Sequence, residues 1–471
     1  MDIRRTIKQF LIAIVAQGVS LTASLAMSLL VPKVLDVTEF GYWQLFIFYT
    51  SYSGFFHFGL NDGVYLVEGG KSRDEIEKRT INSCFAIGGA VQLVVAIAVV
   101  TIACLMSLES DRFLTICAFA AYTVVYNLSL YLGYVFQAVN ETKLYSYMVV
   151  IERLFFLVAI VLLFIFKAGD FKLYIVFFFV ARTIAFVYAL WHGRDIVRSG
   201  LDCSILTVRR YVAYVKVGFG LMVANIADIL ILGVARALVD SAWGIEVFGK
   251  VSFSLSMVNF FILFVSQASM VLFPALRQGS SEERRSFYRG IRDMLEIAFP
   301  GIYLLYFPMA AILSLWLPQY ADSMHYFALL IPICVFNTKM DVCCTTYFKV
   351  LREERVLLFV NLVAVCSSTV LSLVGIYVFG SLEAVLIGAV SSIVTRSLWS
   401  ERHLDRKLGV PSSIMPLEEV ALTTSFIVLS LLASSTVAVI GYAFLFVAYL
   451  FVNRSVTLSL LERIHRTLLW R

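Results

Sequence analysis

Residues 80–107 read TINSCFAIGGAVQLVVAIAVVTIACLMS, a stretch without a charged side chain. An α-helix needs about 20 apolar residues to cross the ~30 Å hydrocarbon core of a bilayer, where it must satisfy its backbone hydrogen bonds internally. The stretch is long enough for one such crossing. It therefore predicts a transmembrane helix.

The composition of the whole chain agrees with this interpretation. Of its 471 residues, 60% are hydrophobic and 15% are charged, whereas soluble domains are about half apolar and about a quarter charged. A water-soluble fold cannot bury so much apolar surface. We therefore expect a membrane protein built almost entirely from transmembrane helices.

Similar apolar runs repeat from one end of the chain to the other. The last two share one apolar stretch, which only Ala433-Ser434-Ser435 divides, and no predicted connection exceeds about 20 residues. The fold class we predict is an all-α polytopic membrane protein with about 14 transmembrane helices. We place these spans near residues 8–31, 41–66, 80–107, 112–139, 146–167, 171–192, 211–238, 246–274, 293–317, 322–347, 356–379, 381–399, 418–435 and 437–453.

The positions of the positive charges test this count independently, because cytosolic loops of membrane proteins are enriched in Lys and Arg. With the N-terminus inside, 28 of the 38 Lys and Arg residues fall in predicted inner segments and five in outer ones. This bias predicts that both termini are cytosolic. It also accounts for the net charge of +6, so nucleic acid is not expected as a partner.

A short internal repeat divides the chain. Residues 37–41 (VTEFG), at the start of the second predicted span, resemble residues 245–249 (IEVFG) at the start of the eighth, an offset of 208 residues. Six spans separate equivalent points, which predicts two six-helix bundles related by an axis along the membrane normal, and transporter sites lie between such halves. The predicted parts are residues 1–205, residues 206–415 and two extra helices with a tail over 416–471.

The eight cysteines give no sign of a metal centre. They lack the paired spacing of zinc sites, and the adjacent Cys343 and Cys344 cannot form an ordinary metal clip. We interpret them as small residues of membrane helices. Neither a metal nor another cofactor is expected.

Several motifs resemble those of a known family. The first half contains EFGYW at residues 39–43 and FGL at 58–60, and the second half contains NIAD at 225–228, FGKV at 248–251 and LFPAL at 272–276. With these motifs, its length and its span count, the chain resembles bacterial polysaccharide flippases of the O-antigen type. These transporters belong to the multidrug/oligosaccharidyl-lipid/polysaccharide exporter superfamily.

The resemblance implies two six-helix lobes arranged in a V, with alternating access to a central cavity. The implied substrate is an oligosaccharide linked to undecaprenyl diphosphate, such as a repeat unit of O-antigen, capsule or exopolysaccharide. Cationic side chains would meet its diphosphate, and its polyprenyl tail would lie in lipid between the lobes. The implied location is the bacterial cytoplasmic (inner) membrane, with polysaccharide assembly proteins as further candidate partners.

Four basic residues are candidates for binding the diphosphate. Ionisable groups deep in a membrane are costly and usually face the protein interior or water. Arg182, at the centre of the sixth span, is the first candidate because a planar guanidinium can hold two phosphate oxygens; its alternative is an ion pair with a carboxylate on a neighbouring helix. Lys339 in the tenth span is the second. Arg153 and Lys250 are nearer span ends, where they can also extend to the interface.

Five polar residues are candidates for ion coupling or for a polar cavity. Asp228 and Asn225 share one face of the seventh span, and the alternative for Asp228 is a carboxylate held by a nearby Lys or Arg. Family members often carry a basic residue directly after this aspartate, where the chain has Ile229, which leaves the role of Asp228 open. The repeat places Gln17 of the first span over Asn225.

The other two members of this set lie on the tenth span. At 100° per residue, Asn337 and Asp341 share a face, whereas Lys339 points about 200° away from Asp341. Lys339 and Asp341 therefore cannot both face the same cavity. We expect Lys339 to face the substrate and Asp341 to be a structural partner or a proton site.

Two other functions remain open. A multidrug exporter of the same superfamily should keep carboxylates in its cavity for organic cations, whereas a diphosphate carrier should keep cationic side chains there. Arg182 and Lys339 favour the diphosphate carrier, and Asp228 and Asp341 favour the multidrug exporter. A membrane-embedded polysaccharide polymerase or ligase would usually carry a long outward loop, and the predicted outward connections are short. We therefore expect a transporter and not an enzyme.

Overall fold

The structure is a computed structural model that describes residues 18–202, 204–278, 281–411 and 415–458, without the side chains of 261 and 263–281. Regular structure in the described residues is entirely helical, as expected from the composition. The chain divides into two compact units on either side of the Ile226–Ala227 bond. Each unit is described by itself.

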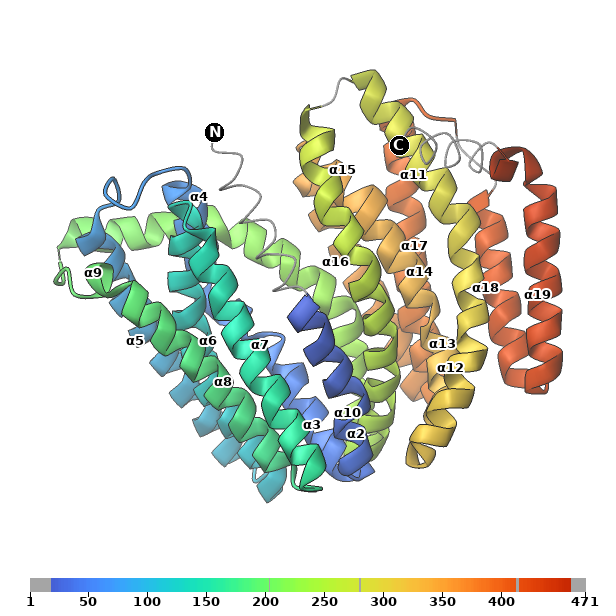
Figure 1. The fold of residues 1–471 in the computed structure, drawn as a ribbon, viewed down its shortest axis with the longest axis horizontal. Helices are drawn as coiled ribbons and strands as arrows, with labels where there is room; N and C mark the ends of the chain where they lie inside the picture. The colour runs from blue at the N-terminus through green and yellow to red at the C-terminus, as the bar shows by residue number, and fades with distance from the viewer. Residues whose placement is uncertain (1–17, 203, 279–280, 412–414, 459–471) are drawn as a thin grey trace. The chain divides into compact units, whose positions relative to one another are not determined.

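The first unit contains a helix over residues 18–29 and the first part of α10 (Ile205–Gln278). Between them lie α2 (Val31–Val34), α3 (Val37–Thr50), η1 (Ser53–His57), α4 (Leu60–Glu68), α5 (Lys78–Leu105), α6 (Ser110–Ala138), α7 (Thr142–Ile165), α8 (Phe171–His192) and α9 (Arg194–Val197). Helices α5 to α8 follow one another up and down the unit, and each packs against the next (Figure 1).

The second unit contains the remainder of α10 and all later elements. These are α11 (Ser281–Ala298), η2 (Phe299–Ile302), α12 (Tyr303–Trp316), η3 (Pro318–Tyr320), α13 (Ser323–Leu330), α14 (Pro332–Lys339), η4 (Met340–Thr345), α15 (Thr346–Val350), α16 (Glu354–Val374), η5 (Gly375–Phe379), α17 (Leu382–Leu408), α18 (Met415–Leu432) and α19 (Ser435–Val452). The apolar stretch divided at Ser434 is therefore two helices, as predicted.

The helices account for the predicted membrane crossings. Eleven segments of the described residues are long and apolar enough to cross a membrane, and one of them, Ile205–Phe260, has length for two crossings. The shorter apolar helix Gly18–Val34 and the broken segment α3–η1–α4 supply the remaining two. The prediction of about 14 transmembrane helices agrees with this count.

The second predicted span is not the continuous helix expected over 41–66. It is interrupted after η1, where Phe58 and Gly59 have φ angles of 51° and 88°. A left-handed backbone is costly for a residue with a side chain, and buried amides compensate at this break. Asn127 donates to the Ser53 carbonyl at 2.9 Å and Gln92 donates to the Phe56 carbonyl at 2.5 Å.

Helix α4 crosses the first part of α10 at very close range. A Cβ on Gly63 would collide with the backbone of Tyr214, and one on Gly218 would collide with the backbone of Gly59 and Gly63. Small residues permit such backbone contacts between membrane helices. Glycine is therefore required at both Gly63 and Gly218.

The repeat predicted from the sequence has a counterpart in the backbone. In the first half, Asp36 is non-helical and caps the start of α3 by accepting a hydrogen bond from the Glu39 N–H. In the second half, Gly244 interrupts α10 with φ 79° and ψ −175°. Positions 36 and 244 differ by the offset of 208 residues, so both halves break their first helix pair at the equivalent place.

Ion pairs between side chains connect several helices at one end of the first unit. Arg73, in the connection between α4 and α5, pairs with Glu141 and with Asp195, both at 2.6 Å. Lys78 adds a second cation 2.8 Å from Asp195. These pairs tie α5, α9 and the start of α7 together outside the apolar spans.

Candidate functional site

Polar side chains gather within the apolar spans of both units. In the first unit, Arg182 of α8 forms an ion pair with Glu152 of α7 at 2.9 Å. Its guanidinium also lies over the ring of Tyr126 at 4.7 Å and over that of Tyr122 at 6.0 Å. We call these four residues, with Arg153, the arginine–tyrosine site.

Arg153 is the member of this site whose charge is not neutralised by a described neighbour. It follows Glu152 on α7 and is partly exposed. Its charge acts on Tyr126 and Tyr145, and among the described residues no hydrogen bond or ion pair of Arg153 is recorded. The arginine–tyrosine site therefore combines an arginine neutralised by Glu152 with an arginine that can bind an anion.

In the second unit, Arg396 of α17 is a buried guanidinium held by polar groups from three other helices. It pairs with Asp228 of α10, and it donates to Asn337 of α14 at 2.8 Å and to Asn361 of α16 at 3.3 Å. Asp341 is close enough for the charges of Arg396 and Asp228 to act on it. We call these five residues the Arg396 site.

The Arg396 site unites three of the residues singled out in the sequence, Asp228, Asn337 and Asp341. The helical face predicted for Asn337 and Asp341 agrees with their common position near Arg396. The roles of these three residues in ion coupling remain predictions. The alternative stated for Asp228 was a carboxylate held by a nearby Lys or Arg, and Arg396 is such a partner.

Lys339 lies in a different environment. Its side chain is 0% exposed, and its Nζ is 2.6 Å from Glu401 of α17, 2.9 Å from Glu419 of α18 and 3.3 Å from Glu296 of α11. It therefore faces the interior of the second unit in this conformation and does not reach a surface where a substrate could bind. We call the four residues the Lys339 cluster.

A second ion pair lies one helical turn away from the Lys339 cluster. Arg292 precedes Glu296 by four residues on α11, and Asp405 follows Glu401 by four residues on α17. Arg292 pairs with Asp405 at 2.8 Å and with the partly buried Asp293 at 2.9 Å. Helices α11 and α17 thus carry two successive layers of buried charge.

The remaining predicted residues are placed apart from these groups. Lys250 of α10 pairs with the exposed Asp322 at 3.1 Å, and Asn225 is an exposed residue of α10. Gln17 lies outside the described residues. Neither Lys250 nor Asn225 belongs to the arginine–tyrosine site or to the Arg396 site.

The sequence analysis missed several of the residues that hold these groups. Arg396, near the end of the predicted span 381–399, was counted among the inner charges, although α17 continues to Leu408 and buries it. None of Glu152, Glu296, Glu401 and Glu419 was singled out from the sequence, and the last three of them lie at the ends of predicted spans. These glutamates could have been found by looking for carboxylates that stand among apolar residues recurring at helical spacing, because such a position predicts a carboxylate on a buried helix face.

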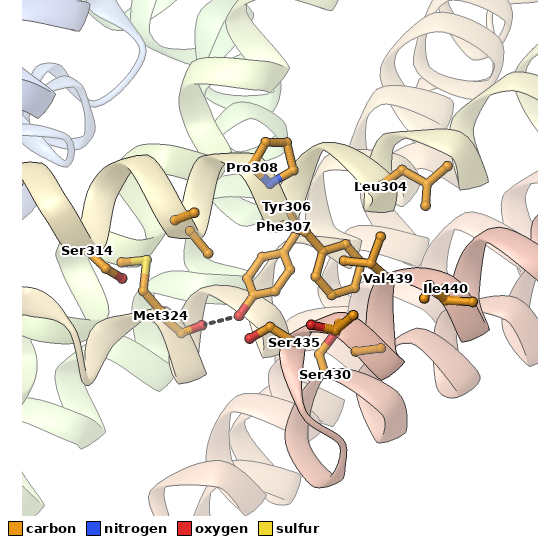
Figure 2. Close-up of a pocket in the computed structure, with 14 residues that line it drawn as sticks. Leu304, Tyr306, Phe307, Pro308, Ser314, Met324, Ser430, Ser435, Val439 and Ile440 are labelled. Atoms are coloured by element: carbon orange, nitrogen blue, oxygen red, sulfur yellow. Dashed lines mark hydrogen bonds between the residues drawn. The ribbon is translucent and has the colours of Figure 1, made fainter.

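An apolar pocket of about 660 Å³ lies in the second unit between α12, α13, α18 and α19 (Figure 2). Tyr306 and Phe307 point into it, and Tyr306 donates a hydrogen bond to the Met324 carbonyl at 3.1 Å. Val439 and Ile440 of α19 line the opposite wall. Since Ile440 is largely exposed, the pocket opens on the apolar surface of the unit.

The described residues do not include three His, Cys, Asp or Glu side chains arranged to hold a metal ion. The chemistry that the described groups offer is instead ionic. They can bind an anion at the free guanidinium of Arg153, and they can exchange protons at buried carboxylates.

Neither a protein-family model nor a curated protein matches the chain. Solved structures match by fold. The lipid II flippase MurJ in an inward closed conformation aligns with a TM-score of 0.67 at 11% identity, covering 98% of this chain and 100% of that chain. An inward-facing multidrug resistance MATE family transporter of the MOP superfamily aligns with a TM-score of 0.61 at 12% identity, covering 84% and 96%.

A third match is the Vibrio cholerae MATE transporter VcmN, with a TM-score of 0.54 at 15% identity, covering 88% of this chain and 99% of that chain. At such identities the likeness concerns the fold. The chain therefore has the fold of MOP superfamily transporters. Its substrate has to be argued from its own residues.

Proposed function

We propose that this protein is a transporter that moves a polyprenyl-diphosphate-linked oligosaccharide across the cytoplasmic membrane by alternating access. The observation that carries the proposal is the arginine–tyrosine site, where Arg153 is partly exposed and has no recorded counter-ion among the described residues. A cation without a partner is unfavourable in a membrane. A diphosphate would supply the missing negative charge.

The chemistry of the arginine–tyrosine site suits a sugar diphosphate. Arginine binds phosphate oxygens through two parallel N–H groups. Arg182, held by Glu152, lies over the rings of Tyr122 and Tyr126, and the charge of Arg153 acts on Tyr126. Tyrosine rings offer an apolar face together with a hydroxyl. We propose that Arg153 contacts the diphosphate and that these tyrosines contact the first sugar.

The extent of the fold matches supports a flippase over a drug exporter. The match to the lipid II flippase covers nearly the whole chain, so it includes α18 and α19, whereas the MATE family transporter leaves about a sixth of the chain unmatched. The apolar pocket between α12, α13, α18 and α19 offers a place for part of the polyprenyl tail. A bulky residue at Val439 should then slow transport of the lipid-linked substrate.

Asp228 favours the second candidate function, a multidrug exporter. Its carboxylate is half exposed and could attract an organic cation. However, Arg396 neutralises that charge in this conformation. The flippase therefore remains the leading proposal, with Asp228 and Asp341 of the Arg396 site as candidates for coupling.

The test is to delete the gene and to quantify polyprenyl-diphosphate oligosaccharides in the membrane by mass spectrometry, together with the surface polysaccharide. Accumulation of the carrier-linked repeat unit with loss of its surface product would support the flippase, and the sugar composition would identify the substrate. An unchanged carrier pool with altered sensitivity to cationic drugs would favour the multidrug exporter.

Complementation of the deletion strain with variants tests the arginine–tyrosine site directly. Wild-type protein and the control Arg198→Ala, which changes an exposed arginine in the connection to α10, should both restore the surface product. Arg153→Ala should restore it poorly at an equal protein level in the membrane. Full restoration by Arg153→Ala would remove the argument for anion binding at the arginine–tyrosine site.

A further inference from the structure

The Lys339 cluster holds more negative than positive charge. One ammonium faces the three carboxylates of Glu296, Glu401 and Glu419, and every side chain in the cluster is at most 2% exposed. If all four groups were ionised, two negative charges would be unbalanced inside the protein. Burial of uncompensated charge is so costly that such groups become neutral by binding protons.

The carboxylate oxygens confirm that Lys339 cannot satisfy all three groups. Four carboxylate oxygens (Oε2 of Glu296, both oxygens of Glu401 and Oε1 of Glu419) are buried without a hydrogen-bond partner among the described residues. All three carboxylates lie within 3.3 Å of the same Lys339 Nζ. An ionised carboxylate can only accept hydrogen bonds, so a buried oxygen without a donor favours the protonated form of its carboxyl group.

The groups around the cluster do not supply the missing positive charge. Arg292 is occupied by Asp405 and Asp293. Among the described residues, the other titratable groups that face the cluster are neutral thiols and phenols, contributed by α11, α12, η4 and α19: Tyr288, Tyr303, Cys343, Cys344, Tyr442 and Tyr449.

We infer that the Lys339 cluster is a proton-binding site, in which the carboxyl groups of Glu296, Glu401 and Glu419 hold a proton between them beside Lys339. A metal ion is not needed at this place, because the Lys339 ammonium already occupies the centre of the carboxylates. The purified protein should hold this proton whether or not the proposed substrate is correct.

The test is infrared spectroscopy of the full-length protein in lipid bilayers at neutral pH. Protein labelled with ¹³C-glutamate should show the carbonyl band of a protonated glutamic acid, and the band should shift in D₂O. Glu296→Gln and Glu401→Gln should each weaken it strongly. The matched control Glu383→Gln changes an exposed carboxylate at the opposite end of α17 and should leave the band intact.

Two results would overturn the inference. The first is a wild-type spectrum without a protonated glutamic acid at neutral pH, which needs no variant to interpret. The second is a band that survives both substitutions unchanged. If either variant fails to insert into the membrane, Glu419→Gln replaces it, and an unchanged band in Glu419→Gln would likewise assign the proton elsewhere.

Discussion

The guanidinium of Arg396 and the carboxylate of Asp228 form an ion pair whose partners differ sharply in exposure, since the arginine side chain is 2% exposed and the aspartate side chain is 50% exposed. The cation is therefore fixed within the second unit, whereas the anion can be hydrated. Removing Arg396 should therefore change the free energy of unfolding by a different amount from removing Asp228.

Asp228→Ala should destabilise the protein more than Arg396→Met. Removing the aspartate leaves a buried guanidinium without its counter-ion, which costs about 2–3 kcal/mol, whereas removing the arginine leaves an aspartate that water can solvate. Thermal unfolding in detergent of both single variants and the double variant measures this difference. The double variant should be close to Arg396→Met, and strictly additive losses would show that the pair is not coupled.

In the arginine–tyrosine site, Arg153 and Arg182 should respond differently to substitution by alanine. Arg182→Ala leaves Glu152 buried without its cation, so it should reduce both the melting temperature and export of the repeat unit. Arg153→Ala removes no recorded contact and should reduce export alone. Melting temperature and export measured in parallel would contradict the assignment if Arg153→Ala were the less stable variant.

Asp195 gives a prediction for pH. Burial alone would raise the pKa of this carboxyl, but hydrogen bonds and charges from Arg73 and Lys78 outweigh burial and hold its pKa well below the usual range. A lowered folded-state pKa stabilises the fold above the unfolded-state pKa of about 3.9, and this contribution is lost as the pH falls further.

Asp195→Asn should therefore melt at a lower temperature than the wild type between about pH 5 and 7, and the difference should narrow progressively as the pH falls below about 4 towards the lowered folded-state pKa. Asp74→Asn is the control, because its carboxylate is 97% exposed and 3.9 Å from Lys78. A difference between wild type and Asp195→Asn that persists unchanged at low pH would show that Asp195 acts through something other than its charge.

Gly218→Ala and Gly220→Ala form a matched pair on α10. A Cβ at Gly218 meets the backbone of α4, whereas nothing lies within 4 Å of a Cβ at Gly220. Overpacking costs about 1–3 kcal/mol, and replacing glycine in an open helical position is neutral or slightly stabilising. The yield of folded protein and its melting temperature should thus fall only for Gly218→Ala; equal behaviour would mean that α4 and α10 do not cross so closely.

A topology reporter tests the predicted orientation. A cytosolic reporter fused after Arg471 should be active, and the same reporter in the connection at Ser434 should be inactive, since α18 and α19 are separate crossings. Activity at Ser434 with none at Arg471 would reverse the predicted orientation.

The helices could be predicted from the sequence because a bilayer demands long apolar runs, and these are visible residue by residue. The break at Phe58 and Gly59 could not be predicted, because it depends on amides of α5 and α6 that are distant in the sequence. The angular position of each residue around the helix correctly placed Asn337 and Lys339 on different faces. The sequence could not reveal that Asn337 faces a guanidinium and Lys339 faces three carboxylates, because these groups come from other helices.

Depth in the membrane was the main source of error at the candidate sites. Arg396 lies where a predicted span ends, and sequence alone does not distinguish a charge that extends to the interface from one buried by a longer helix. The glutamates of the Lys339 cluster share this ambiguity. Their burial follows from packing of α11, α14, α17 and α18, which no local pattern specifies.

The C-terminal hairpin of α18 and α19 supplies Glu419 to the Lys339 cluster, and Tyr442 and Tyr449 of α19 donate hydrogen bonds to backbone carbonyls of η2 and α11. The hairpin is therefore an integral part of the second unit, because it contributes a charged group to the Lys339 cluster and hydrogen bonds to η2 and α11. Shortening the chain before Met415 would remove one of the three carboxylates and uncover Lys339 on the side of α18, so a shortened version of this protein would need a new set of charges around position 339.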